Sequence, residues 1–243
     1  MIEVREAAQR SCTREEGRTT WHSFSFGAHY DPRNVGFARL AAHNDERLPP
    51  GTGYADHPHA DVEVVSWVVS GSLRHASTVG SGVLGPGSVQ RLSAGSGVVH
   101  SEVDDQTAGG TRFVQAWVRP DESDLDPSWV HEPVDLGEGW TCVADGRGAG
   151  LVPIAARGAS LHVADLADGQ RLELPDLPRL HAFVVAGLRA EQEGRDEPDR
   201  SAGVMLGERR LVDGDVARLL DEGGRSVTGV GSAQLVVWGF DAP

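Results

Sequence analysis

The sequence predicts an all-β protein built from two barrels of similar plan. Of its 243 residues, 31 are glycine and 13 are proline, and the valine-rich runs between them are short. Frequent turn residues between short β-branched runs are typical of strands joined by tight turns. A chain of this length suits one large barrel or two of about 120 residues each, and an internal repeat favours two.

The repeat is visible in two pairs of segments. Residues 84–92 (LGPGSVQRL) align with residues 211–219 (LVDGDVARL), and five of these nine positions are identical. Upstream, residues 67–71 (WVVSG) align with residues 183–187 (FVVAG) at a slightly different offset. The charged segment Glu191–Arg200, which has loop composition, accounts for the difference. Because internal repeats fix an architecture, one duplication is expected.

The duplication sets the expected domains. Residues 1–130 are expected to form an N-terminal barrel, and residues 131–243 a degenerate C-terminal barrel. The connection is placed within residues 121–150, which are rich in acidic residues, proline and glycine and contain no long periodic segment. Such a composition is typical of a linker rather than of a core element.

Within the first barrel, residues 1–20 are expected to form an opening strand and a loop. Residues 21–26 alternate aromatic and small polar side chains, which indicates a strand. Residues 44–51, with Asn44-Asp45-Glu46 and a Pro-Pro-Gly turn, are expected to break regular structure as a connector or as the rim of a pocket. Residues 111–118 alternate again, and the face carrying Gln115 is either a pocket wall or the outer face.

Two pairs of potential ligands predict a metal site. Side chains two residues apart in a strand share a face, so His57 and His59 point one way, as do His100 and Glu102. If the two strands are neighbours in a barrel, three imidazoles and one carboxylate converge. A single histidine is more often a surface or core residue, but two such pairs separated by glycine turns and valine strands favour a metal site over a structural polar cluster.

The donor types restrict the ion. Three neutral nitrogens and one carboxylate oxygen suit a divalent transition metal such as iron, manganese, nickel, copper or zinc, whereas calcium and magnesium prefer oxygen donors. Four protein ligands leave an octahedral ion open positions for water, dioxygen or substrate. Glu63 also has the parity of His57. It is open whether it is a fifth ligand, an acceptor for a ligand imidazole or a proton acceptor near the substrate, and the last two are favoured.

The second barrel is expected to lack this site. The repeat aligns His57 with Glu173 and His59 with Pro175, neither of which preserves an imidazole. It also aligns His100 with Val227 and Glu102 with Gly229. His162 and His181, which do not lie at ligand positions, are interpreted as ordinary strand residues.

Composition excludes several classes of function. With 22 basic and 36 acidic residues, the net charge of −14 disfavours direct binding of nucleic-acid phosphates. Cys12 and Cys142 form no CxxC motif, so neither a disulfide framework nor a thiolate site is indicated. The polar N-terminus does not resemble a signal peptide, and no apolar run approaches the roughly 20 residues that span a bilayer. A cytoplasmic protein that does not bind membranes is expected.

These motifs together resemble the pirin family of the cupin superfamily. The resemblance is dense over residues 21–120 and weak but collinear beyond them. It is carried by WHSFSF (21–26), YDP (30–32), HPH (57–59), GPGSVQ (85–90), SAG (93–95) and HSE (100–102). It implies a bicupin, with two antiparallel β-barrels packed face to face and one metal, usually Fe(II), in the N-terminal barrel. The ligands that it implies are His57, His59, His100 and Glu102.

The resemblance also implies two kinds of function. Some pirins are similar to quercetinases (quercetin 2,3-dioxygenases), which cleave flavonols with dioxygen, and Glu102 or Glu63 would accept the flavonol hydroxyl proton. Others act as iron-dependent, redox-sensing regulators through protein contacts, a role that an acidic chain could play with a basic partner. An isomerase or hydrolase using the same open metal is a third alternative, and a monomer is expected. Two departures from the family pattern, Ala60 and the lack of an acidic residue after His75, leave the substrate open.

Overall fold

The computed structural model describes residues 1–186 and 201–242, so the predicted loop Glu191–Arg200 lies outside the described residues. The described chain is nearly all β and contains 22 strands and one short 3-10 helix, η1 (Ala7–Gln9). Within this part of the chain, no helix has the length and apolarity that crossing a membrane requires. The strands, with one short helix among them, confirm the predicted all-β class.

The described chain divides into two compact units. The N-terminal unit comprises Ser11–Asp135 and Ala144–Arg157, and the C-terminal unit comprises Met1–Arg10, Leu136–Val143 and the residues from Gly158 onwards. Strand β1 (Ile2–Arg5) pairs antiparallel with β20 (Val216–Leu220), with Ile2 opposite Leu219. The first strand of the chain thus joins a sheet made largely of the second half, whereas the repeat alone assigns it to the first barrel.

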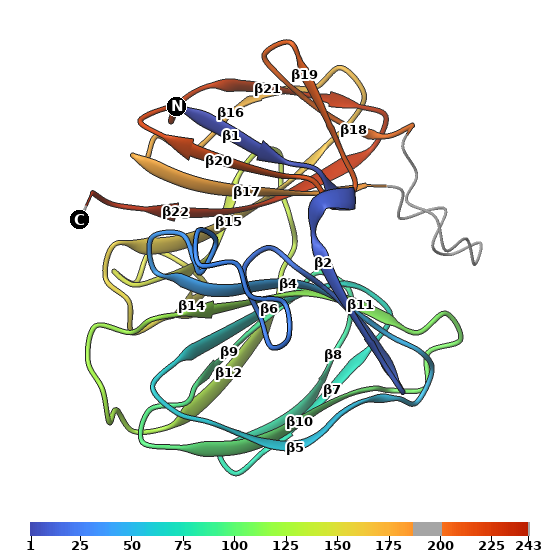
Figure 1. Cartoon of the computed structure of the whole chain (residues 1–243), viewed down its shortest axis with the longest axis vertical. Helices are drawn as coiled ribbons and strands as arrows, with labels where there is room; N and C mark the ends of the chain where they lie inside the picture. Colours follow the sequence, from blue (N-terminus) through green and yellow to red (C-terminus); the bar gives the residue numbers. More distant parts are fainter. Residues whose placement is uncertain (187–200, 243) are drawn as a thin grey trace. The chain divides into compact units, whose positions relative to one another are not determined.

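The N-terminal unit contains two antiparallel sheets that face each other (Figure 1). One has seven strands in the order β12-β9-β6-β11-β4-β3-β2, and the other has four in the order β5-β10-β7-β8. The strands are β2 (Ser11–Glu15), β3 (Arg18–His22), β4 (Leu40–Leu48), β5 (Gly53–His59), β6 (Glu63–Ser70), β7 (Leu73–Ser77), β8 (Gly80–Leu84), β9 (Ser88–Ser93), β10 (Val98–Asp104), β11 (Thr111–Val118) and β12 (Ser128–Pro133).

The other two sheets have the same numbers of strands and the same plan at their centres, and they differ at the edges of the larger sheet. The seven-stranded one has the order β1-β20-β17-β22-β15-β13-β14, and the four-stranded one has the order β16-β21-β18-β19. The pair β6 and β9 in the first set corresponds to β17 and β20 in the second, as the sequence repeat predicts. The further strands are β13 (Thr141–Asp145), β14 (Val152–Pro153), β15 (Ala159–Leu166), β16 (Arg171–Glu173), β17 (Arg179–Ala186), β18 (Gly203–Leu206), β19 (Arg209–Val212), β21 (Ser226–Val230) and β22 (Ala233–Phe240).

The interior of the N-terminal unit is layered. Along β6, Val64 belongs to one apolar cluster and Val68 to another, and Ser66 lies between them on the same face. Each fully buried apolar side chain contributes about 1.5–3 kcal/mol, so the two clusters hold the sheets together around a polar middle layer. That middle layer contains Ser66, Gln90, His100, Glu102 and Gln115.

One expected loop is a strand. Asn44, Asp45 and Glu46 were predicted to break regular structure, but β4 continues through all three, and each is at most 4% exposed. Their polar groups have partners on neighbouring strands: Thr20 Oγ1 donates to Glu46 at 2.5 Å, Arg112 Nε donates to Asp45 at 2.8 Å, and the side chains of His22 and Asn44 lie 3.0 Å apart. A strand of polar residues is stable here because the fold supplies those partners.

Candidate metal centre

Three of the predicted ligands meet inside the N-terminal unit. Strand β10 lies next to β5, and His100 is directly opposite His57 in the register. One ligand atom from each of His57, His59 and His100 lies within 4.8 Å of the other two. The ring centroids of His57 and His100 are 4.3 Å apart, and those of His59 and His100 are 5.0 Å apart. The structure therefore brings the imidazoles of two separate motifs together, as strand alternation predicts.

The donor atoms of this group suit a metal ion. Among the described residues, His59 Nε2 and both ring nitrogens of His100 are buried without a hydrogen-bond partner. His57 Nδ1 donates to the carbonyl oxygen of Ala55 at 2.8 Å, which leaves Nε2 with its lone pair. Burial lowers the pKa of His59 to about 4 and, together with the neighbouring imidazoles, the pKa of His100 to about 2. His59 and His100 are therefore neutral at pH 7, which is the form of an imidazole that binds metals.

Glu102 lies on the other side of His100. It forms a second group of potential ligands with His100 and His75, again with ligand atoms within 4.8 Å of one another, rather than joining His57 and His59. Burial raises the pKa of Glu102 to about 7, although hydrogen bonds to its carboxylate oppose this. The four-ligand set of His57, His59, His100 and Glu102 remains a prediction, since the structure divides it between two groups.

Two glutamines hold the Glu102 carboxylate. Gln90 Nε2 donates to Oε1 at 2.7 Å, and Gln115 Nε2 donates to Oε2 at 2.8 Å. Each glutamine is fixed in turn by an indole, because Trp129 Nε1 donates to Gln90 Oε1 and Trp117 Nε1 donates to Gln115 Oε1. The face of β11 that carries Gln115 is therefore the inner wall, which settles the alternative that the alternating pattern left open.

Glu63 does not belong to this centre. It is buried, but it lies three residues from the inward-facing Ser66 on β6 and so points to the opposite face of the sheet. Its carboxylate accepts a hydrogen bond from Ser93 Oγ at 2.5 Å and lies 3.9 Å from Arg91 Nε. The parity argument was wrong here because the chain leaves β5 at His59, turns at Asp61 with a φ of 51°, and resumes in a different sheet.

The residue that sequence reasoning missed is His75. It lies opposite Glu102 on β7 and is fully buried. The available signal was its alternation with Leu73, the buried residue two positions earlier in the same strand. That signal is weak by itself, because one histidine on an inward face is usually a satisfied core residue.

An aromatic wall and a surface hollow adjoin His59. The Trp117 ring meets the His59 ring edge-on, with centroids 4.9 Å apart, and Phe26 meets Trp117 in the same way at 5.3 Å. A hollow of about 550 Å³ is lined by His59 and by its neighbours Pro58, Ala60, Thr78 and Gly97–Val99. This volume is within the range of small-molecule sites, and His59 is the one residue of the group that lines the hollow.

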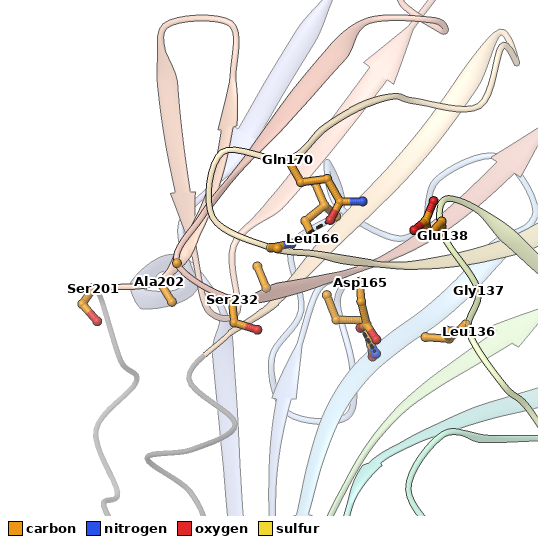
Figure 2. A pocket seen from close by; sticks show the side chains of 13 residues that line it. Leu136, Gly137, Glu138, Asp165, Leu166, Gln170, Ser201, Ala202 and Ser232 are labelled. Carbon is orange, nitrogen blue, oxygen red and sulfur yellow. Dashed lines mark hydrogen bonds between the residues drawn. The ribbon is translucent and has the colours of Figure 1, made fainter.

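A larger hollow in the C-terminal unit has different chemistry. It measures about 810 Å³, and Figure 2 shows Asp165, Gln170 and Glu138 among the residues that line it. Asp165 accepts a hydrogen bond from Gln234 Nε2 at 2.8 Å. Its lining residues include no histidine or cysteine, so volume alone does not locate the chemistry of this protein.

At the corresponding positions of the C-terminal unit, the side chains are apolar. Val227 on β21 occupies the place that His100 has on β10, between Leu172 on β16 and Leu206 on β18. All three contribute to the hydrophobic core of that unit. The strand pairing aligns His57 with Leu172, one residue before the Glu173 that the sequence repeat had suggested.

A buried carboxyl elsewhere in the polar layer yields a prediction about stability. Glu46 accepts hydrogen bonds from Thr20 Oγ1 and, at 2.8 Å, from the Tyr54 hydroxyl, yet burial raises its pKa from 4.5 to about 7. Protonation therefore favours the folded state, and this contribution is complete below pH 4.5 and lost as the pH rises through about 7. Ionised Glu46 is expected to cost about 3 kcal/mol at higher pH.

Glu46→Gln should remove this pH dependence. Urea unfolding at pH 5, 7 and 8.5 should show the wild type losing stability relative to the variant as the pH rises. Glu132→Gln, a change at an exposed position of β12, is the control and should leave the curve unchanged. A constant difference between wild type and Glu46→Gln over this range would contradict the assignment.

The fold and the centre define a class of protein. Two barrels of similar plan in one chain, with an imidazole-rich centre between the sheets of the first, are the arrangement of a bicupin. Comparison with known proteins is consistent with this class. A family model for pirin matches residues 4–118.

Individual relatives extend the match to the whole chain. A Mycobacterium tuberculosis protein, named provisionally as a quercetin 2,3-dioxygenase, is 38% identical over 248 residues, which cover 99% of this chain and 96% of that protein. The crystal structure of YhhW from Escherichia coli superposes with a TM-score of 0.85 at 23% identity, covering 100% of this chain and 99% of YhhW. The nickel(II) complex of the same bacterial pirin gives 0.84 at 22% identity, with both chains covered completely. The chain belongs to the pirin family.

Proposed function

We propose that this protein is a metal-dependent dioxygenase of the quercetinase type, which cleaves flavonols with dioxygen. The observation that carries the proposal is the group formed by His57, His59 and His100, whose ligand atoms lie within 4.8 Å of one another beside an open hollow. The provisional name of the Mycobacterium tuberculosis relative, quercetin 2,3-dioxygenase, supports the choice of substrate.

The proposed cofactor is one divalent transition metal. His57, His59 and His100 would hold it, with Glu102 as the fourth ligand. We propose Fe(II), the ion implied by the family. The nickel(II) complex of YhhW supports a divalent ion, and imidazole donors also suit manganese, copper and zinc.

When bound, the metal would lower the pKa of a flavonol hydroxyl and bring the electron-rich flavonolate next to dioxygen. The Trp117 ring would orient the flat substrate at the edge of His59. Glu102 would accept the hydroxyl proton at Oε2, because Oε1 receives hydrogen bonds from both Gln90 and Ser66, whereas Oε2 receives one, from Gln115.

Aerobic incubation of the metal-loaded protein with quercetin tests the proposal. Loss of flavonol absorbance should accompany uptake of oxygen and release of carbon monoxide, and His59→Ala should abolish all three. His162→Ala, a histidine substitution in the C-terminal unit, and Glu63→Gln, on the face of β6 away from the centre, should retain turnover within about twofold. No turnover of several flavonols by fully loaded wild type would reject this function and favour the iron-dependent regulator acting through protein contacts.

A further inference from the structure

His75 is a buried imidazole for which the described structure gives no hydrogen bond. Its side chain is completely inaccessible, and neither Nδ1 nor Nε2 has a hydrogen-bond partner among the described residues. A buried polar group left in this state costs about 1–3 kcal/mol. Native proteins rarely keep such groups, and binding of an ion is one of the usual reasons for them.

The His75 ring is held in a fixed plane. It stacks on the indole of Trp129 with centroids 4.9 Å apart and an interplanar angle of 3°, and Trp129 stacks in turn on His131. Gly82 makes room for the indole, since a Cβ at that position would lie 2.7 Å from the Trp129 ring. Stacking occupies the ring face. A metal binds an imidazole nitrogen in the ring plane, so the stack orients His75 without blocking coordination.

The donors around His75 form a set of their own. Strand β10 lies between β5 and β7, so His57 and His59 are on one side of His100, and His75 is on the other. The second group comprises His75, His100 and Glu102, which are at most 1% exposed. Two imidazoles and one carboxylate are a donor set that binds zinc and similar divalent ions.

We propose that the N-terminal unit offers a divalent cation two alternative positions that share His100. The outer position is the one assigned to catalysis under the proposed function, and the inner one is formed by His75, His100 and Glu102. The two positions exclude each other because a neutral imidazole has a single lone pair. The inner position shares His100 with the outer one and, in the four-ligand set of the proposed function, Glu102 as well, but it requires no dioxygenase activity.

Cobalt(II) titration of variants tests the inner position directly. His57→Ala/His59→Ala removes the outer position and should still bind about one equivalent of Co²⁺, with a visible absorption spectrum different from that of the wild type. Adding His75→Phe, which keeps the stacking on Trp129, should weaken this binding at least about tenfold. Adding Glu102→Gln should weaken it similarly. Adding His131→Phe, which changes the other side of the same stack, should leave it unchanged.

The outcomes separate this inference from the proposed function. Failure of the folded double variant to bind Co²⁺, while the wild type binds it, would overturn the inner position alone. Equal binding with and without His75→Phe would also overturn it. Wild-type protein that binds no Co²⁺ would overturn both the inner and the outer position. Circular dichroism of each variant establishes that it is folded before titration.

Discussion

His100→Ala is expected to abolish metal binding by this protein. His100 is the one residue common to both groups of potential ligands, so its loss leaves two donors on one side and two on the other. The affinity for Ni²⁺ should fall by more than about 100-fold. Removing a residue that only hydrogen-bonds to a metal ligand already costs up to about 100-fold, and removing the ligand itself should cost more. Turnover of quercetin should disappear with the metal.

Thermal unfolding gives a readout that does not depend on activity. An ion at 100 times its dissociation constant stabilises the folded state by about 2.7 kcal/mol, so wild type should melt at a higher temperature with Ni²⁺ than with a chelator. His100→Ala should show no such difference, and His162→Ala should behave as the wild type does. A metal-dependent melting shift in His100→Ala would show that the ion binds elsewhere.

Arg112→Met is expected to cause a large loss of stability in the N-terminal unit. Arg112 Nε and Nη2 donate to the two carboxylate oxygens of Asp45 at 2.8 and 3.0 Å, and both side chains are at most 4% exposed. Removing the guanidinium leaves a buried carboxylate without this counter-ion, which typically costs about 3–5 kcal/mol. Urea unfolding followed by tryptophan fluorescence should show the loss as a lower midpoint.

Two comparisons make this prediction specific. Arg74→Met breaks the ion pair between Arg74 and Asp105, in which Arg74 is largely exposed, and should cost at most about 1 kcal/mol. Arg112→Met/Asp45→Leu removes both charges and should regain much of the stability lost in the single variant. Equal losses from Arg112→Met and Arg74→Met would show that burial of the pair does not decide its strength.

Within a single strand, the sequence predicted geometry well. His57 and His59 lie on one strand, His100 and Glu102 lie on another, and each pair faces the interior as the alternation requires. The same reasoning failed for Glu63 because it was carried across a turn into another sheet. Alternation is a property of one continuous extended segment, and a single residue with positive φ ends it.

Composition also failed to predict a strand made of polar residues. Asn44, Asp45 and Glu46 have the composition of a loop, yet they form the middle of β4. Their partners, such as Arg112, are distant in the sequence and adjacent only in the folded sheet. The composition of a segment shows which polar groups need hydrogen-bond partners. It does not show whether neighbouring strands supply those partners.

The sequence by itself determined the all-β class and the duplication. It also determined that His57 and His59 share one face of a strand, as His100 and Glu102 do. Strand alternation, turn residues and repeats are local patterns, which is why the sequence suffices for them. Only the tertiary structure decided that β1 pairs with β20, that Glu63 faces away and that His75 joins His100 and Glu102. Those outcomes depend on which strands are neighbours. Neighbour choice is set by the packing of all the strands together, which no single segment encodes.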